Sequence, residues 1–255
     1  LSLESGADAA LAIMTTDTRP KQMAAKVPLP GGDITIGGMA KGSGMIHPDM
    51  ATMLAVITTD AVVDADVLRT QLVSVVDRTF NRISVDGDTS TNDTVFLIAN
   101  GASGVELADS GASAVFEDGL THICRELAKM IVRDGEGVTK FVTVRVGGAR
   151  TQSEAHLIAN TIATSPLVKT AFAGGDPNWG RIMMAAGRAG VSLDPQRLQL
   201  WIGEGENDDH PLPLVAYGTP CDYPEADAER IFAQPEFSFH LDLGLGDAQT
   251  SVWTG

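Results

Sequence analysis

The sequence predicts a mixed α/β protein (α+β), and three observations support this fold class. Segments with strand-like alternation and segments with helical spacing follow one another along the whole chain. Of the 255 residues, 44% are apolar and 20% are charged, so a sizeable core can form. The 27 glycines exceed the usual share of about 7%, which indicates many tight turns. This length suits one large domain or two small ones.

The first half of the chain is expected to contain strands and one well-marked helix. Asp64 is a suitable N-cap for a helix that runs to about Phe80, because apolar residues recur on one face of that segment. Strands are expected at residues 33–36, ending at a glycine pair, at residues 52–59, and at residues 95–99, a continuous apolar run typical of burial on both faces.

The second half continues the alternation. Apolar residues at helical spacing from Phe116 to Ile131 predict a long amphipathic helix. Residues 142–146 alternate valine with Thr143 and Arg145, which predicts a strand with one wet face. The remaining expected elements are helices at residues 153–163 and after Asn178, and strands at residues 198–202 and 237–243.

Composition excludes several classes of partner and site. Asp and Glu outnumber Lys and Arg by 33 to 18, and no basic cluster offsets the net charge of −15, so neither nucleic acid nor a membrane is an expected partner. No apolar run approaches the roughly 20 residues of a membrane span, and no signal peptide is recognisable at the first residues. The two cysteines fit a reducing cytoplasm, and the five histidines lack metal-ligand spacing, so no metal site is expected.

The segment around Thr52 is the most informative one for chemistry. Glycines and a proline constrain residues 41–50, and Thr52 follows the small Ala51 where a strand is expected to begin. A hydroxyl held beside the preceding carbonyl can attack it, and hydrolysis of the resulting ester would free Thr52 as a new N-terminus. Its α-amine, with an ordinary pKa of about 7.7–8.0, suits a general base at neutral pH. Spacing alone favours the plainer interpretation that Thr52 merely begins a strand, since threonine is common there.

Four blocks of sequence carry a resemblance to a known family. They are residues 41–60 (KGSGMIHPDMATMLAVITTD), 84–94 (SVDGDTSTNDT), 134–140 (DGEGVTK) and 175–182 (GDPNWGRI). Together they resemble the glutamate/ornithine N-acetyltransferases of arginine biosynthesis. The resemblance implies a layered sandwich of sheets and helices like that of N-terminal-nucleophile enzymes, cut by the protein itself between Ala51 and Thr52. Residues 1–51 would then be the C-terminal part of an α chain, without the family's N-terminal part, and residues 52–255 the β chain, with a candidate subdomain boundary near residues 147–170.

The resemblance also implies the reaction and the assembly. The expected enzyme is cytoplasmic and moves the acetyl group of N2-acetylornithine to glutamate through an ester on the Thr52 hydroxyl. The transfer requires no cofactor, although some family members also use acetyl-CoA, which these blocks do not distinguish. Cleaved α and β chains are expected to form a hetero-oligomer, a heterotetramer.

Site residues follow from the same match. The Thr52 hydroxyl is the expected nucleophile and the Thr52 α-amine the expected base. Ala51 is the other residue of the scissile peptide bond. Lys41 and Glu136 are expected to contact substrate, because a cation can pair with the α-carboxylate of an acyl amino acid and a carboxylate suits the ammonium end of ornithine. The family has a Thr-Gly element resembling an oxyanion hole before the residues present here, and a substrate-contacting Asn and Thr beyond the Trp253 region.

Two other loops have weaker interpretations. Residues 84–94 fail as a calcium loop, because Thr91 replaces the glycine and Leu97 the glutamate that such loops require, so an active-site wall with a structural role is expected. Asn178 is expected to N-cap a helix, and Arg181 to pair across a domain contact.

Two other functional classes stay open beside the acetyltransferase. An N-terminal-nucleophile aminopeptidase or amidase would use the same nucleophile but give the acyl group to water. A chain that is never cut would be a non-enzymatic relic.

Overall fold

The computed structural model describes residues 5–47, 53–107 and 109–255. The chain forms two compact units, Leu1–Glu136 and Gly137–Gly255. The division at residues 136 and 137 lies before the boundary expected near residues 147–170. Strand β6 (Phe141–Ala149) and helix α4 (Gln152–Ala163) pack on each other within the second unit, so the chain does not divide between them.

The first unit contains a sheet in the spatial order β1-β2-β3-β5. Its strands are β1 (Lys21–Leu29), β2 (Gly32–Lys41), β3 (Leu54–Thr59) and β5 (Thr94–Ala99). Strand β2 is antiparallel to both β1 and β3, whereas β3 and β5 are parallel. The parallel pair places the starts of β3 and β5 side by side, with Leu54 opposite Thr94.

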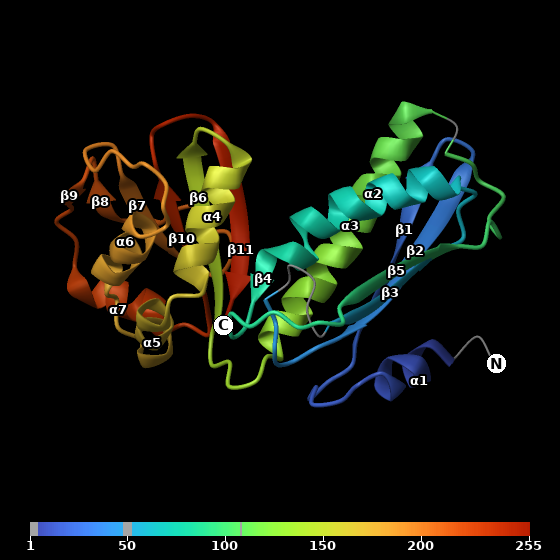
Figure 1. The fold of residues 1–255 in the computed structure, drawn as a ribbon, viewed down its shortest axis with the longest axis horizontal. Helices are drawn as coiled ribbons and strands as arrows, with labels where there is room; N and C mark the ends of the chain where they lie inside the picture. The colour runs from blue at the N-terminus through green and yellow to red at the C-terminus, as the bar shows by residue number, and fades with distance from the viewer. Residues whose placement is uncertain (1–4, 48–52, 108) are drawn as a thin grey trace. The chain divides into compact units, whose positions relative to one another are not determined.

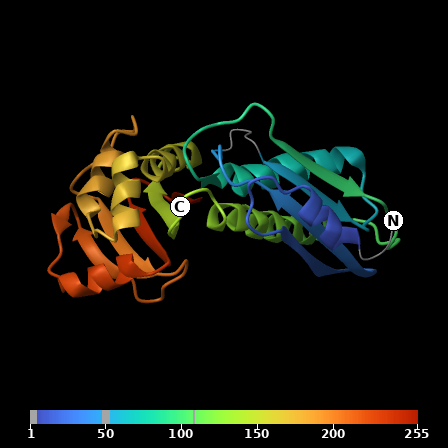
Figure 2. The same ribbon diagram turned by 90° about the horizontal axis from the view of Figure 1, so that it is seen from below.

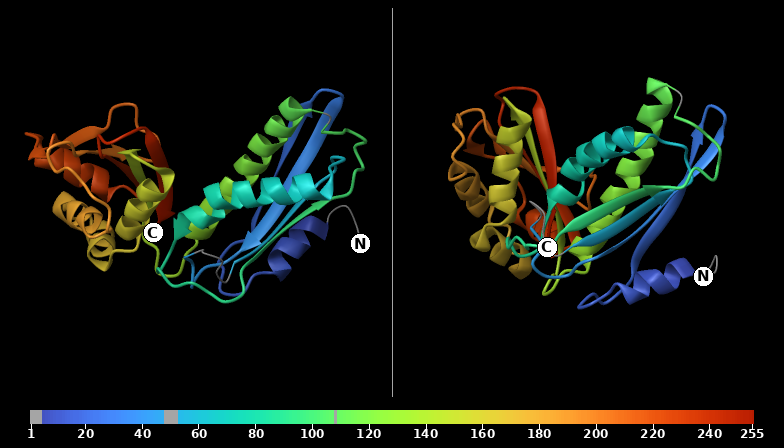
Figure 3. Two further views of the ribbon diagram at one scale, coloured as in Figure 1. Left: turned by 45° about the horizontal axis from the view of Figure 1, so that its top comes forward. Right: turned by 45° about the vertical axis from the view of Figure 1, so that its right-hand side comes forward.

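Helices cover one face of this sheet. Helix α3 (Ser110–Arg133) packs on β1 and β2, and α2 (Ala65–Arg78) runs alongside α3 (Figures 1 and 2). Gly38 allows the close approach of α3, because a Cβ there would lie only 2.9 Å from a methyl group of Leu127. The short helix α1 (Ser5–Ala12) lies on the opposite face (left view of Figure 3). The 3₁₀ turn η1 (Phe80–Arg82) and the short strand β4 (Ile83–Ser84) follow α2.

Local signals in the first unit agree with the sequence analysis in part. Asp64 caps α2 as expected, and its side chain accepts the N–H of Asp66 at 2.8 Å. The glycine pair expected to end a strand lies inside β2. The expectation that residues 95–99 are buried on both faces is wrong, because Phe96 and Ile98 are about half exposed on the face away from α3.

The second unit contains a sheet whose strands lie in the order β11-β6-β10-β7-β8-β9. Besides β6 they are β7 (Gln199–Glu204), β8 (Leu212–Ala216), β9 (Thr219–Pro220), β10 (Glu236–Asp242) and β11 (Ala248–Thr254). Strands β6 and β10 are parallel and the other pairs are antiparallel.

Four helices complete the second unit. They are α4, α5 (Pro166–Gly174), α6 (Trp179–Gly187) and α7 (Glu225–Ala233). Helix α4 packs on β6 and β11 (Figure 1), and Phe172 of α5 contacts Phe232 of α7 and Phe237 of β10 in the core. The expected wet face of β6 is wrong, since Thr143 is fully buried and Arg145 is half-buried. The mixed α/β class is confirmed.

Candidate functional site

The predicted nucleophile Thr52 and its partner Ala51 lie outside the described residues. The chain is described up to His47 on one side and from Met53 on the other. Two segments of the first unit surround these ends. We call them the glycine loop (residues 41–47) and the aspartate loop (residues 84–94).

The aspartate loop holds the upstream end of the gap. The Asp86 carboxylate accepts the N–H of Met45 at 2.5 Å and that of Ile46 at 3.0 Å. Ile46 also accepts the N–H of Val85 at 2.6 Å, and the carbonyl of His47 accepts the Thr89 hydroxyl at 3.1 Å. These bonds hold the glycine loop in a conformation in which Met45 has a φ of 56°, uncommon for a residue other than glycine.

The aspartate loop also holds the described chain on the other side of residues 48–52, at Met53. Asp93 Oδ1 accepts the N–H of Met53 at 2.5 Å, and the carbonyl of Met53 accepts the N–H of Thr94 at 3.0 Å. Burial raises the pKa of Asp93 to about 6, although the Met53 N–H and the charge of Lys41 act in the opposite direction. The aspartate loop is therefore bonded to the chain on both sides of residues 48–52.

Glu136 lies against the glycine loop. Its N–H donates to the carbonyl of Ser43 at 2.8 Å, and a Cβ on Gly44 would come within 2.8 Å of its carboxylate. A larger residue at position 44 would therefore require the Glu136 side chain to move. Lys41, at the end of β2, is half-buried, and its charge acts on Asp93. Within the described part of the chain, neither the Lys41 ammonium nor the Glu136 carboxylate is engaged in a salt bridge.

A buried charge cluster lies directly behind both loops. Lys21 is 1% exposed and its ammonium lies 2.5 Å from Asp17 Oδ1 and 2.6 Å from Asp134 Oδ2. Asp17 also accepts the N–H of Gly42 at 2.8 Å, and the carbonyl of Asp134 accepts the Ser43 hydroxyl at 3.0 Å. The cluster thus connects the start of β1, the glycine loop and the turn that carries Glu136.

Asp134 shows how strongly this cluster favours its charged state. Burial alone would raise the pKa of Asp134, but hydrogen bonds from Lys21 and Thr18 and the charge of Lys21 lower it to about 2. The Thr18 N–H donates at 3.0 Å and its hydroxyl also donates to the same carboxylate. The carboxylate is therefore ionised at neutral pH, as a pairing role with Lys21 requires.

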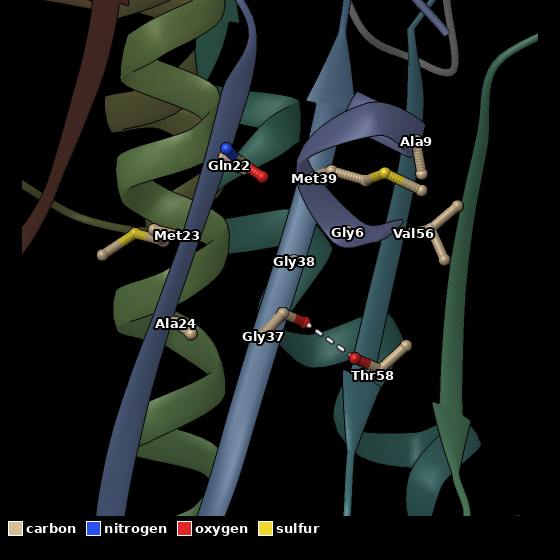
Figure 4. Close-up of a pocket in the computed structure, with 10 residues that line it drawn as sticks. All are labelled: Gly6, Ala9, Gln22, Met23, Ala24, Gly37, Gly38, Met39, Val56 and Thr58. Carbon is tan, nitrogen blue, oxygen red and sulfur yellow. Dashed lines mark hydrogen bonds between the residues drawn. The ribbon is translucent and has the colours of Figure 1, made fainter. Parts of the chain in front are cut away.

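A hollow on the other face of the sheet lacks such groups. It lies between α1 and strands β1 to β3, and Figure 4 shows the side chains around it, among them Ala9, Met39, Val56 and Thr58. None of the described residues that line it is charged. The described residues also contain no cluster of three or more His, Cys, Asp or Glu that could hold a metal ion.

The structure brings two of the predicted site residues together, because Glu136 contacts the loop that begins at Lys41. Sequence analysis assigned the aspartate loop to a wall of the site but missed the individual roles of Asp86 and Asp93. The available signal was the position of Asp93 immediately before a strand. The buried cluster of Lys21 was missed altogether, because Lys21 and Asp134 are 113 residues apart in the sequence.

Residues of the second unit that had been singled out have local roles. Asn178 occupies the N-cap position of α6, although its side chain makes no capping hydrogen bond. Arg181 donates to the carbonyl of Leu167 and the hydroxyl of Thr170, both at 2.9 Å, and lies 3.8 Å from Asp176. Arg181 thus has partners within its own unit, and the domain contact expected for it stays a prediction. None of the helices in the described ranges has both the length and the apolar character needed to cross a membrane.

Curated relatives cover nearly the whole chain. The arginine biosynthesis bifunctional protein ArgJ of Symbiobacterium thermophilum is 49% identical over 255 residues, which are 99% of this chain and 62% of that protein. The glutamate N-acetyltransferase of Methanocaldococcus jannaschii is 47% identical over 95% of this chain and 61% of that protein. The chain therefore spans about three fifths of the length of these relatives.

A solved structure and a family model agree with these relatives. The crystal structure of arginine biosynthesis bifunctional protein ArgJ from Bacillus halodurans superposes with a TM-score of 0.73 at 36% identity, covering 78% of this chain and 92% of that chain. The model of the ArgJ family matches residues 1–255. The protein is a member of the ArgJ family.

Proposed function

We propose that this chain carries the self-cleavage point and the acetyl-carrying residue of a glutamate N-acetyltransferase that uses N2-acetylornithine as donor. One observation supports the proposal above all: the aspartate loop is bonded to residues 45–47 on one side of Thr52 and to Met53 on the other. Both ends of the segment containing the Ala51–Thr52 bond are thereby restrained. Restraint at both ends suits an intramolecular attack, because the entropy of alignment is lost on folding and not in the reaction.

Self-cleavage requires only groups of this segment and water. The Thr52 hydroxyl oxygen attacks the Ala51 carbonyl, the peptide C–N bond breaks, and the released nitrogen takes the proton as the α-amine of Thr52. Water then hydrolyses the ester, leaving Ala51 with a carboxylate and Thr52 with a free hydroxyl and a free amine.

Acetyl transfer reuses the same two groups. The Thr52 oxygen attacks the acetyl carbonyl of N2-acetylornithine while the α-amine accepts the hydroxyl proton, and that proton leaves with the α-amine of ornithine. The α-amine of glutamate then attacks the acetyl ester, and the Thr52 oxygen regains a proton. Lys41 pairs with the α-carboxylate of the substrate and Glu136 with the side-chain ammonium of ornithine.

The test uses the protein at its natural full length. Mass spectrometry should find a chain that begins Thr-Met-Leu-Ala, and Thr52→Ala should give one uncut chain without transfer, because the attacking oxygen is absent from both reactions. Thr58→Ala is the matched control, because Thr58 lies on β3, the strand that follows Thr52. This variant should mature and react normally. An uncut parental protein would overturn the proposal.

The acceptor distinguishes transfer from hydrolysis. With N2-acetylornithine and glutamate, acetylglutamate should form; free acetate in place of acetylglutamate would identify an N-terminal-nucleophile amidase. Because the acetyl group travels on Thr52, the proposed cycle needs no cofactor. Replacing N2-acetylornithine by acetyl-CoA in the same assay tests whether that donor also forms the ester.

Assembly and location are part of the proposal. The cleaved α and β chains form a hetero-oligomer, a heterotetramer, in the cytoplasm. The low cysteine content, two in 255 residues, suits this location.

A further inference from the structure

The glycine loop contains two glycines, and the backbone explains only one of them. Gly42 has a φ of 153°, a value that residues with a side chain rarely adopt. The φ of Gly44 is not positive, so its backbone conformation is open to any amino acid. Glycine loses more conformational entropy on folding than any other residue, so its presence at position 44 calls for another explanation.

The explanation lies in the carboxylate of Glu136. A Cβ on Gly44 would lie 2.8 Å from Glu136 Oε2, 2.9 Å from its Cδ and 3.2 Å from its Oε1. The whole carboxylate group therefore rests where other residues carry a side chain. Because ordinary contacts between heavy atoms are about 3.5–4.0 Å long, alanine at position 44 would displace the carboxylate by roughly 0.7–1 Å.

The backbone around this contact is held in place by other bonds. The Ser43 carbonyl accepts the N–H of Glu136 at 2.8 Å, and the Ser43 hydroxyl donates to the carbonyl of Asp134 at 3.0 Å. The Asp134 carboxylate is itself paired with the buried ammonium of Lys21. Alanine at position 44 would therefore turn the Glu136 side chain and leave the two segments joined.

The Glu136 carboxylate is open on the side away from Gly44. Glu136 is exposed, and its carboxylate takes part in no hydrogen bond or ion pair within the described ranges. A cation that binds this carboxylate has to approach from the open side, because the loop backbone occupies the other. A shift away from Gly44 thus moves the carboxylate into the space that the cation uses.

We propose that Gly44 determines the length of the diamino acid that the site accepts, by letting the Glu136 carboxylate lie back against the glycine loop. The ammonium end of N2-acetylornithine finds room at this carboxylate while the α-carboxylate pairs with Lys41. Alanine at position 44 reduces that room and favours a shorter side chain. This inference rests on the proposed function, because it takes Lys41 and Glu136 as the groups that hold the two ends of the substrate.

The experiment compares Gly44→Ala with the parental full-length enzyme on two acetyl donors. One is N2-acetylornithine, and the other is N2-acetyl-2,4-diaminobutyrate, whose side chain is one methylene shorter. We expect normal cleavage and a fall of about ten-fold in kcat/KM for N2-acetylornithine, chiefly through KM, because the displaced carboxylate binds the ammonium less well. The ratio of kcat/KM for the shorter donor to that for N2-acetylornithine should rise by about five- to ten-fold.

Two controls separate this role from a general effect on the enzyme. KM for glutamate, which has no side-chain ammonium, should stay within about two-fold of the parental value in Gly44→Ala. Gly187→Ala is the matched variant, because a Cβ on Gly187 of α6 would meet no atom within 4 Å, and it should leave both donors unaffected.

A double variant tests whether Gly44 acts through Glu136. If it does, adding Gly44→Ala to Glu136→Ala should leave the donor ratio as it is in Glu136→Ala alone, because the carboxylate to be displaced is absent. A further change of the ratio in the double variant would contradict the inference.

The remaining outcomes are equally decisive. A donor ratio in Gly44→Ala that is unchanged or moved towards N2-acetylornithine would overturn the inference and leave the proposed function intact. A Gly44→Ala chain that stays uncut would do the same, since Gly44 would then serve the shape of the glycine loop. An uncut or inactive parental protein would overturn the proposed function as well.

Discussion

Two buried aspartates of the first unit, Asp93 and Asp134, show how hydrogen-bond donors decide the charge state of a carboxyl group. Both lose contact with water, which by itself raises a pKa. Asp134 receives donors from Lys21 and Thr18 and its pKa falls to about 2, whereas the one donor that the described residues give Asp93 is the Met53 N–H, and its pKa rises to about 6. Asp134 is therefore ionised in its pair with Lys21, whereas the carboxyl group of Asp93 takes up a proton more readily than an ordinary aspartate.

Lys41 and Glu136 provide a residue-scale prediction. If they hold the charged ends of the amino acid, Lys41→Ala and Glu136→Ala should mature normally but transfer poorly. Loss of a charge-assisted hydrogen bond costs about 1.5–3 kcal/mol, or roughly ten- to a hundred-fold in kcat/KM. Glu136→Ala should affect N2-acetylornithine more than glutamate, because glutamate has no side-chain ammonium.

Steady-state kinetics and mass spectrometry of each variant check this prediction, with the exposed Lys26→Ala on β1 as control. Parental kinetics of Glu136→Ala with N2-acetylornithine would contradict its role. A Lys41→Ala chain that stays uncut would assign Lys41 to the shape of the glycine loop instead of substrate binding.

At the scale of elements, the buried cluster of Lys21, Asp17 and Asp134 fixes loops that belong to different parts of the sequence. Lys21 begins β1, the Gly42 N–H that Asp17 accepts follows β2, and Asp134 follows α3. Both substrate-contacting candidates are attached to these loops. The elements therefore set the geometry of the candidate site through a group of buried charges.

Lys21→Met should destabilise the protein and change its response to acid. Removing one partner of a buried ion pair costs about 3–5 kcal/mol, because the remaining charges are left without compensation. In the parent, the pKa of Asp134 is about 2 when folded and 3.8 when unfolded. That depressed pKa stabilises the folded state above pH 4 by about 2 kcal/mol, and this contribution is lost as the pH falls from 4 to 2.

Chemical denaturation between pH 2 and pH 7 measures this effect. The variant should show a lower midpoint at neutral pH and a shallower loss of stability below pH 4. Lys26→Met, an exposed lysine of the same strand, is the control and should follow the parent. Parallel stability curves for Lys21→Met and the parent would show that the cluster does not hold the charge of Asp134.

At the scale of the whole molecule, the proposed cut would separate segments that the fold keeps paired. Strands β1 and β2 precede Thr52, whereas β3, β5 and α3 follow it. Residues Ile36 to Lys41 of β2 still pair with Leu54 to Thr59 of β3, and α3 packs on β1 and β2. The Lys21–Asp134 pair also joins the two sides of the cut. These contacts can hold cleaved α and β chains together.

The whole-molecule prediction is that the cleaved full-length protein stays associated and forms a heterotetramer. Light scattering should give a mass of two α and two β chains. Native mass spectrometry should show the same complex, and the chains should separate only after denaturation. A single αβ unit in solution would contradict the tetramer. Spontaneous separation of the chains would contradict the role of the β2–β3 pairing.

The positions of the main helices were largely predictable from the sequence alone. Asp64 and the apolar face behind it are enough to mark α2, and the spacing from Phe116 to Ile131 marks α3, because capping and helical periodicity depend on residues within a few positions of one another. The resemblance of four blocks to the acetyltransferase family was likewise readable from the sequence, and the family is confirmed.

Only the tertiary structure decided which residues face one another and which surfaces are covered. The sequence analysis did not predict β1, whose buried Lys21 looks like a surface lysine until Asp134, 113 residues away, provides its charge partner. Likewise, an apolar run such as residues 95–99 does not reveal that Phe96 and Ile98 are half exposed. Burial and charge pairing depend on contacts between distant segments, so the sequence determined the elements and the family, and packing determined the bonds of Asp93 and Asp134.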